Sequence, residues 1–251
     1  MITKYFTATA TPVIPASKQH ATITSGKVLF DWTELEIPRG SSALRGVTIL
    51  SRPKGDATPT SNIVSMQLFF SKTNTISFGT IGANPDRVPN NDFLGRIEIE
   101  EANYSHGNLL GTAVATSGKA SNSGTDLTPI VLTGTPTNGA NVGYDKVYVA
   151  AIATGTFDGA SINTVASTAA AGTTVVCDGV SFLNENHFLP GDVLQAATTV
   201  GANAADTVFG TIASITNATT LELTTTSLDS FVDGTILINQ NPIRVICSFE
   251  K

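Results

Sequence analysis

The sequence predicts an all-β protein: a jelly-roll-like β-sandwich with a small β-barrel-like module inserted before its last strand. Short alternating or apolar stretches recur roughly every 10 to 15 residues, separated by turn-forming residues, as in sandwiches and jelly rolls. Only 14% of the 251 residues are charged, and Thr, Ser, Ala, Gly and Asn take their place, which favours strands and turns over helices. The third observation is that residues 172–239 have a strand-and-turn pattern of their own.

The first 26 residues predict an edge strand or an extended arm. Thr alternates with apolar residues between Tyr5 and Pro15, and the prolines at 12 and 15 restrict such a strand to the edge of a sheet. An arm of this kind can reach a neighbouring subunit, and we expect its deletion to leave the fold intact. The residues expected to touch a partner are Ile2, Tyr5, Phe6, Val13 and Ile14.

Seven further stretches predict the strands of the sandwich. The stretch 27–37 alternates and ends at the turn residues 38–42. The stretch 63–71 is apolar at nearly every position, and the stretch 93–101 carries alternating glutamates. They are residues 27–37, 43–51, 63–71, 93–101, 109–115, 126–132 and 144–152. With the final strand at 242–249, they assign residues 1–160 plus 241–251 to the sandwich.

Residues 153–171 are small and polar, and they predict a linker to the inserted module. Within residues 172–239, five short strands predict a small curled barrel. They are residues 173–177, 192–194, 209–215, 220–224 and 235–238. The similar segments 188–194 and 231–237 are interpreted as two β-turns of the same kind, because a single pair does not establish a repeat.

Charge and cysteine usage exclude several classes of function. The formal net charge is −6 and the basic residues are scattered, which disfavours nucleic-acid binding. No apolar run approaches the roughly 20 residues that span a bilayer, so no membrane partner is expected. Cys177 and Cys247 each lie in an apolar strand pattern and are expected to be buried free thiols. Without paired Cys or His spacing, neither a zinc site nor a cofactor is predicted.

No set of residues predicts catalysis. His20, His106 and His187 lie in separate segments without a nucleophile signature. Glu98 and Glu100 share one strand face and are compatible with glycoside cleavage, but such spacing is common on solvated strands. The sequence therefore predicts a protein that is not an enzyme.

Two weaker patterns concern ligands. Residues 84–92 hold the possible calcium ligands Asp86, Asn90, Asn91 and Asp92, without the spacing of a calcium loop, so an ordinary turn is favoured. Aromatic residues at four positions are compatible with a sugar-binding face, and core or rim packing is the favoured interpretation. They are Trp32, Tyr104, Tyr144 and Tyr148.

Segments at both ends and in the middle of the chain resemble a known group of proteins. They are Phe30-Asp-Trp-Thr33, Ile37-Pro-Arg-Gly40, Asn141-Val-Gly-Tyr-Asp145, Val147-Tyr-Val-Ala-Ala151 and residues 244–251. Together they resemble virion structural proteins of tailed phages, particularly marine and cyanobacterial ones. The motifs consist of packing and turn residues and include no active-site signature.

The resemblance implies a capsid decoration or cement protein on the capsid surface of the virion. Its expected partners are the major capsid protein and neighbouring copies of itself, as a homo-oligomer. Tail fibres are longer and repetitive, so they fit this short chain less well. A tail-associated receptor- or carbohydrate-binding β module remains the alternative, and a polysaccharide-degrading enzyme is a third possibility without support from any feature.

Overall fold

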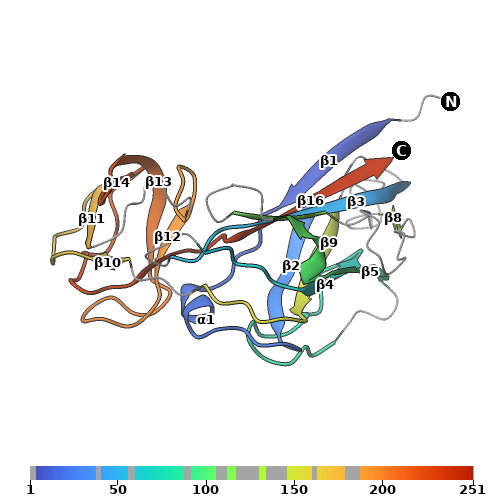
Figure 1. Cartoon of the computed structure of the whole chain (residues 1–251), viewed down its shortest axis with the longest axis horizontal. Helices are drawn as coiled ribbons and strands as arrows, with labels where there is room; N and C mark the ends of the chain where they lie inside the picture. The colour runs from blue at the N-terminus through green and yellow to red at the C-terminus, as the bar shows by residue number, and fades with distance from the viewer. Residues whose placement is uncertain are drawn as a thin grey trace.

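Two antiparallel sheets face each other in the larger part of the molecule, and a separate β module extends from one end (Figure 1). The computed structural model describes residues 4–37, 41–55, 60–87, 92–105, 112–116, 130–133, 146–159, 163–178 and 187–250. Apart from the helix α1 (Ala16–His20) and the 3-10 turn η1 (Glu101–Asn103), the regular structure in these ranges is β-strand. The predicted all-β class is confirmed.

The first sheet contains the first and the last strands in chain order. Its order is β1 (Tyr5–Ala10), β16 (Ile243–Glu250), β3 (Ser41–Ser51), β7 (Ala113–Thr116) and β6 (Tyr104–Ser105). A further short strand, β8 (Ile130–Thr133), pairs with the first half of β3 on the side where β7 pairs with its second half.

The second sheet has the order β2 (Val28–Glu36), β9 (Lys146–Ala153), β4 (Met66–Ser71) and β5 (Phe93–Ile99). The chain passes repeatedly from one sheet to the other, and the last strand, β16, inserts between β1 and β3 of the first sheet. This arrangement, two Greek keys wound into two sheets, is the jelly roll. The jelly-roll-like sandwich predicted from the sequence is therefore confirmed.

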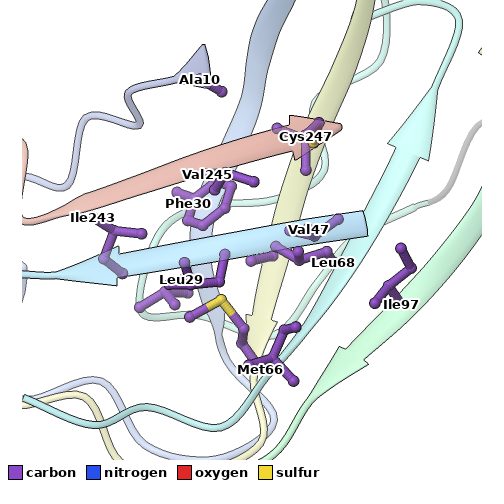
Figure 2. Packing of buried hydrophobic residues seen from close by; sticks show 14 of the residues in the cluster. Ala10, Leu29, Phe30, Val47, Met66, Leu68, Ile97, Ile243, Val245 and Cys247 are labelled. Carbon is purple, nitrogen blue, oxygen red and sulfur yellow. The ribbon is translucent and has the colours of Figure 1, made fainter. Parts of the chain in front are cut away.

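The sandwich core lies between the two sheets. Along β16 the inward residues Ile243, Val245, Cys247 and Phe249 are buried and alternate with more exposed ones. Figure 2 shows side chains of β16 and β3 lying close to Phe30, Met66 and Leu68 of the opposite sheet. Period-two burial of this kind fixes the register, because a slip by one residue would turn the apolar set toward water.

The inserted module is a nearly closed barrel between β9 and β16. Its order is β10 (Thr164–Val165), β11 (Thr174–Asp178), β14 (Thr220–Leu223), β13 (Val208–Asn217), β12 (Val193–Ala196) and β15 (Leu237–Asn239). Backbone bonds from Val165 N–H to the Thr235 carbonyl and from Leu237 N–H to the Asn163 carbonyl join the first strand to the last. The module encloses a core of its own, from Val165 to Leu237.

The predicted linker at residues 153–171 is divided between the two bodies. Phe157 is fully buried in the sandwich core and forms a β-bridge with Ile23, whereas Val165 belongs to the module core. The module thus includes residues before the predicted boundary at 172 and has a sixth strand, β10. The small, polar residues of this stretch gave no sign of β10, because a two-residue strand leaves no periodic pattern.

The N-terminal 26 residues also differ from a free arm. Tyr5–Ala10 forms the predicted edge strand, and the chain then folds into α1, which packs against the module through Ala16. The strand predicted at 93–101 ends at Ile99, because Glu100 and Asn103 form a reciprocal capping box around η1.

Candidate functional site

The outer edge of β1 is the candidate interaction site. On one side β1 pairs with β16 in unbroken antiparallel register, from Tyr5 opposite Glu250 to Ala10 opposite Val245. On its other side, no strand among the described residues pairs with it, as Figure 1 also shows. In an antiparallel strand alternate residues direct both N–H and C=O to the same side, so this edge presents unpaired backbone groups.

The side chains of β1 follow a strict two-residue period. Ala8 and Ala10 point into the sandwich core, and Phe6 stacks on Phe249 with ring centroids 4.9 Å apart. Thr7 and Thr9 lie on the exposed face, beside Tyr5, which is 74% exposed. The strand is therefore anchored by its inner face and leaves an uncharged outer face and an open edge.

Other edges in the described parts of the chain carry features that oppose pairing with a second protein. The long edge strand β2 contains Asp31, Glu34 and Glu36 and two register shifts, and β5 carries Arg96 and Glu98 and one register shift. The strands β6, β8, β10 and β15 have four residues or fewer. Charges, bulges and shortness are the usual protection of sheet edges. Among these edges, β1 alone is six residues long, uncharged and without a bulge.

The five residues predicted to touch a partner do not behave alike. Tyr5 and Phe6 lie on β1, and Val13 is 48% exposed after it. Ile14 is fully buried, and its N–H donates to the Gln240 carbonyl, so it stabilises the fold and presents no surface to a partner. Ile2 lies outside the described residues. Since Ala8, Ala10 and Ile14 are core residues, the expectation that this segment can be deleted without damage to the fold is wrong.

The junction between sandwich and module is held by polar contacts from α1. The Ser17 N–H and hydroxyl both donate to the Asp206 carboxylate, at 2.8 and 2.7 Å. The Gln19 amide donates to the carbonyls of Ile14 and Asn239, at 2.7 and 2.9 Å, and the Ala16 N–H donates to the side chain of Gln195. These contacts join the module, through Gln195, Asp206 and Asn239, to one short helix of the sandwich and fix the position of the module.

A second junction contact is the ion pair between Arg52 and Asp192, 3.1 Å apart and largely buried. Burial lowers the pKa of Arg52 despite the attraction of Asp192. Burial likewise raises the pKa of Asp192, although Arg52 and Arg244 and the N–H of Leu189 act against this shift. For both groups the largest cause of the pKa shift is removal from water, and the attraction within the pair acts against it.

The remaining candidates for chemistry do not form a site in the described residues. His20 lies on α1 and His187 contacts the Pro53 carbonyl, while His106 falls outside the described ranges. No group of three His, Cys, Asp or Glu side chains among the described residues could hold a metal ion. Cys177 and Cys247 are buried and unbridged, and burial raises the pKa of each thiol to about 12.

The predicted carboxylates have local partners. Gln67 donates to Glu98 across the sheet, and Glu100 and Glu101 begin η1. In the predicted calcium loop, Asp92 accepts a bond from the Thr73 hydroxyl, and the Asp86 N–H donates to the Phe78 carbonyl. Asn90 and Asn91 lie outside the described residues.

The aromatic residues are divided between packing and a surface hollow. Tyr104 is buried, its hydroxyl donates to the Val64 carbonyl, and burial raises the pKa of this phenol. Tyr148 is half-buried on β9, and Tyr144 lies outside the described residues. The Trp32 indole packs edge-on against Phe78, 5.1 Å away, and its N–H donates to the Ile76 carbonyl. Beside it, Ile76, Ser77, Asp86 and Arg87 line an open hollow of about 480 Å³.

Comparisons of the chain with models of protein families, with curated proteins and with solved structures gave no match. Among the described residues, no helix has the length and apolar character needed to cross a membrane. The functional assignment therefore depends on the geometry of the molecule and on the resemblance described above.

Proposed function

We propose that the protein is a non-enzymatic virion structural protein: a capsid decoration or cement protein that stabilises the head by bridging capsid subunits. The observation that carries the proposal is the uncharged, unprotected edge of β1. The resemblance to tailed-phage virion proteins supports it. The jelly roll also occurs among viral capsid proteins, which is an analogy of fold and not of site.

The arrangement of the molecule fits a protein that holds neighbouring subunits together at one end and carries a projecting module at the other. The start of β1 and the end of β16 lie at one end in Figure 1, and the module lies at the other. The ion pair between Arg52 and Asp192 and the contacts of α1 hold the module in a fixed position. Strand addition at β1 forms backbone hydrogen bonds with a neighbour in the shell, and repetition over the shell supplies avidity that a single weak contact lacks.

The test is binding of the purified protein to particles that lack it. Because deletion of β1 would remove core residues, the variant is Tyr5→Glu, which adds a charge at a side chain 74% exposed. The control is Leu228→Glu, which adds the same charge to a side chain 96% exposed on the module. We expect the Tyr5 variant to lower occupancy about tenfold or more, because avidity multiplies a small loss per contact, and the control to bind as wild type.

Imaging of intact particles decides between head and tail. Hundreds of copies per particle place the protein on the shell and support the proposal. A handful of copies at the tail, or undiminished binding by Tyr5→Glu, contradicts it.

A tail-associated receptor- or carbohydrate-binding module is the second candidate, and one observation favours it. The hollow beside Trp32 combines the apolar Ile76 with the charged Asp86 and Arg87, and sugar sites combine apolar surface with a few polar groups. This candidate predicts the low copy number and glycan binding by the isolated protein.

A further inference from the structure

We propose that two copies of this chain pair through β1 around a two-fold axis, so that their first sheets join into one continuous antiparallel sheet. The inference shares with the proposed function only the outer edge of β1, and it rests on that function to this extent. It identifies the neighbour at this edge as a second copy of the chain. It concerns the purified protein and requires no particle.

The side chains of β1 decrease in size along the strand. The bulky residues Tyr5 and Phe6 stand at its start, and the small residues Thr9 and Ala10 stand at its end. Antiparallel pairing of two identical strands places the bulky end of each beside the small end of the other. The edge is therefore complementary in shape to itself, which an arbitrary partner strand would not be.

The alternation of β1 limits the register. Residues directly opposite each other in an antiparallel pair lie on the same face of the sheet. The exposed face carries Tyr5, Thr7 and Thr9, and the inner face carries Phe6 and Ala8. A register centred on Thr7 satisfies both faces, because it sets Tyr5 opposite Thr9, Phe6 opposite Ala8 and Thr7 opposite itself.

The pairs formed in this register are favourable ones. Tyr5 opposite Thr9 is an aromatic and β-branched pair, and Thr7 opposite Thr7 allows a hydroxyl-to-hydroxyl bond. Phe6, half-buried and stacked on Phe249, gains a neighbour at the small Ala8 of the second copy. Lys4, the charged residue next to the strand, lies beyond its end, so the two copies of Lys4 stand far apart.

A cysteine at the symmetry axis tests this register. In Thr7→Cys the two Cα atoms would lie about 4.5 to 5.5 Å apart, within the roughly 4.4 to 6.8 Å between the Cα atoms of a disulfide. In the matched control Thr9→Cys, the two cysteines would be about 14 Å apart, four residues along the paired strands. Cys177 and Cys247 are buried, so oxidised wild type serves as the blank.

We expect mild oxidation to convert the Thr7 variant almost completely to a covalent dimer on non-reducing gels, and to leave the Thr9 variant and wild type monomeric on those gels. Equal cross-linking of the Thr7 and Thr9 variants, or none in a Thr7 variant with wild-type melting temperature, overturns the proposal.

Charge at the same position gives an independent measurement. Thr7→Lys and Thr7→Glu place like charges opposite each other, and each should weaken self-association about tenfold or more in sedimentation equilibrium. A mixture of the two should recover a dimer, because opposite charges then meet at the axis. Failure of the mixture to associate better than either variant contradicts the pairing.

The outcomes separate this inference from the proposed function. Cross-linking without binding to particles retains the dimer and rejects the capsid role. Binding to particles by a protein that fails to cross-link retains the capsid role and identifies the occupant of the β1 edge as a capsid strand, which rejects the dimer.

Discussion

Asp192 is the residue whose chemistry most affects the link between module and sandwich. It faces Arg52 at 3.1 Å, lies near Arg244, and accepts the N–H of Leu189. Its own side chain is 3% exposed. A carboxylate in this position balances two guanidinium groups that would otherwise repel each other at the base of the module.

Replacing Asp192 by Asn should therefore destabilise the protein more than replacing the whole pair. Asp192→Asn leaves Arg52 buried without a counter-charge, and we expect a loss of about 3 kcal/mol in the free energy of unfolding. The double variant Asp192→Asn with Arg52→Met should lose less than the single one, because no unpaired buried charge remains at Arg52. Urea unfolding of wild type, both single variants and the double variant measures this cycle. A double variant no more stable than Asp192→Asn would contradict it.

Among the elements of the fold, the segment between β4 and β5 has a role that was not predicted from the sequence. The outer face of the second sheet carries an apolar cluster, Val28, Phe69 and Ala150, which Phe78 from this segment covers. The Asp31 carboxylate holds the segment in place: its oxygens accept the N–H groups of Trp32 and Phe78 and the hydroxyl of Ser77. The cover makes this jelly roll three layers thick at that point.

Phe78→Ala should cost about 3 to 5 kcal/mol in unfolding free energy, as large-to-small changes at fully buried aromatic positions do. Phe93→Ala is the control, because Phe93 is 39% exposed on the neighbouring strand and should cost far less. Thermal or chemical unfolding compares the two. Equal losses would show that the segment around Phe78 does not cover the sheet in solution.

Sequence reasoning predicted the elements with strong periodicity and missed those defined by tertiary contacts. β2, β3, β4 and β9 were predicted within a few residues, because alternation or continuous apolar runs depend on the face that each strand buries. α1 and β10 were missed, since five and two residues are too short for a period to be read.

The candidate site was predicted only in part. The alternation of Thr with apolar residues, together with two prolines, predicted an edge strand or an arm, and β1 is an edge strand. Tyr5 and Phe6, which were predicted to touch a partner, are exposed and half-buried on it. Ile14 was misassigned, because its burial depends on a backbone bond to Gln240, far away in sequence. The lack of protection at β1 also required the structure, since an edge can be recognised as open only when the other edges of the sheets are known.

At the scale of the whole molecule, the chain consists of a jelly roll with a second β body inserted into the connection between its last two strands. The insertion preserves the jelly roll, because β9 and β16 belong to different sheets and any connection between them must cross the end of the sandwich. It also explains why the chain returns from the module into an apolar strand whose residues Val245 and Cys247 are central to the first core.

This arrangement predicts that the module folds alone. Among the described residues, its core draws only on residues 165–237, and the bonds between residues 163–165 and 235–237 hold its two ends together without help from the sandwich. Excision would expose the polar side chains that face α1 and Arg52, namely Gln195, Asp206 and Asp192, to water, together with a small apolar surface at Ala197 and Ile238. We expect a fragment of residues 160–240 to unfold cooperatively in urea, at a lower midpoint than the intact chain because a body of this size buries a smaller fraction of its surface. Dispersed amide resonances with slow exchange in β12 and β13 would accompany that transition, whereas a fragment without a cooperative transition would show that the module core depends on the jelly roll.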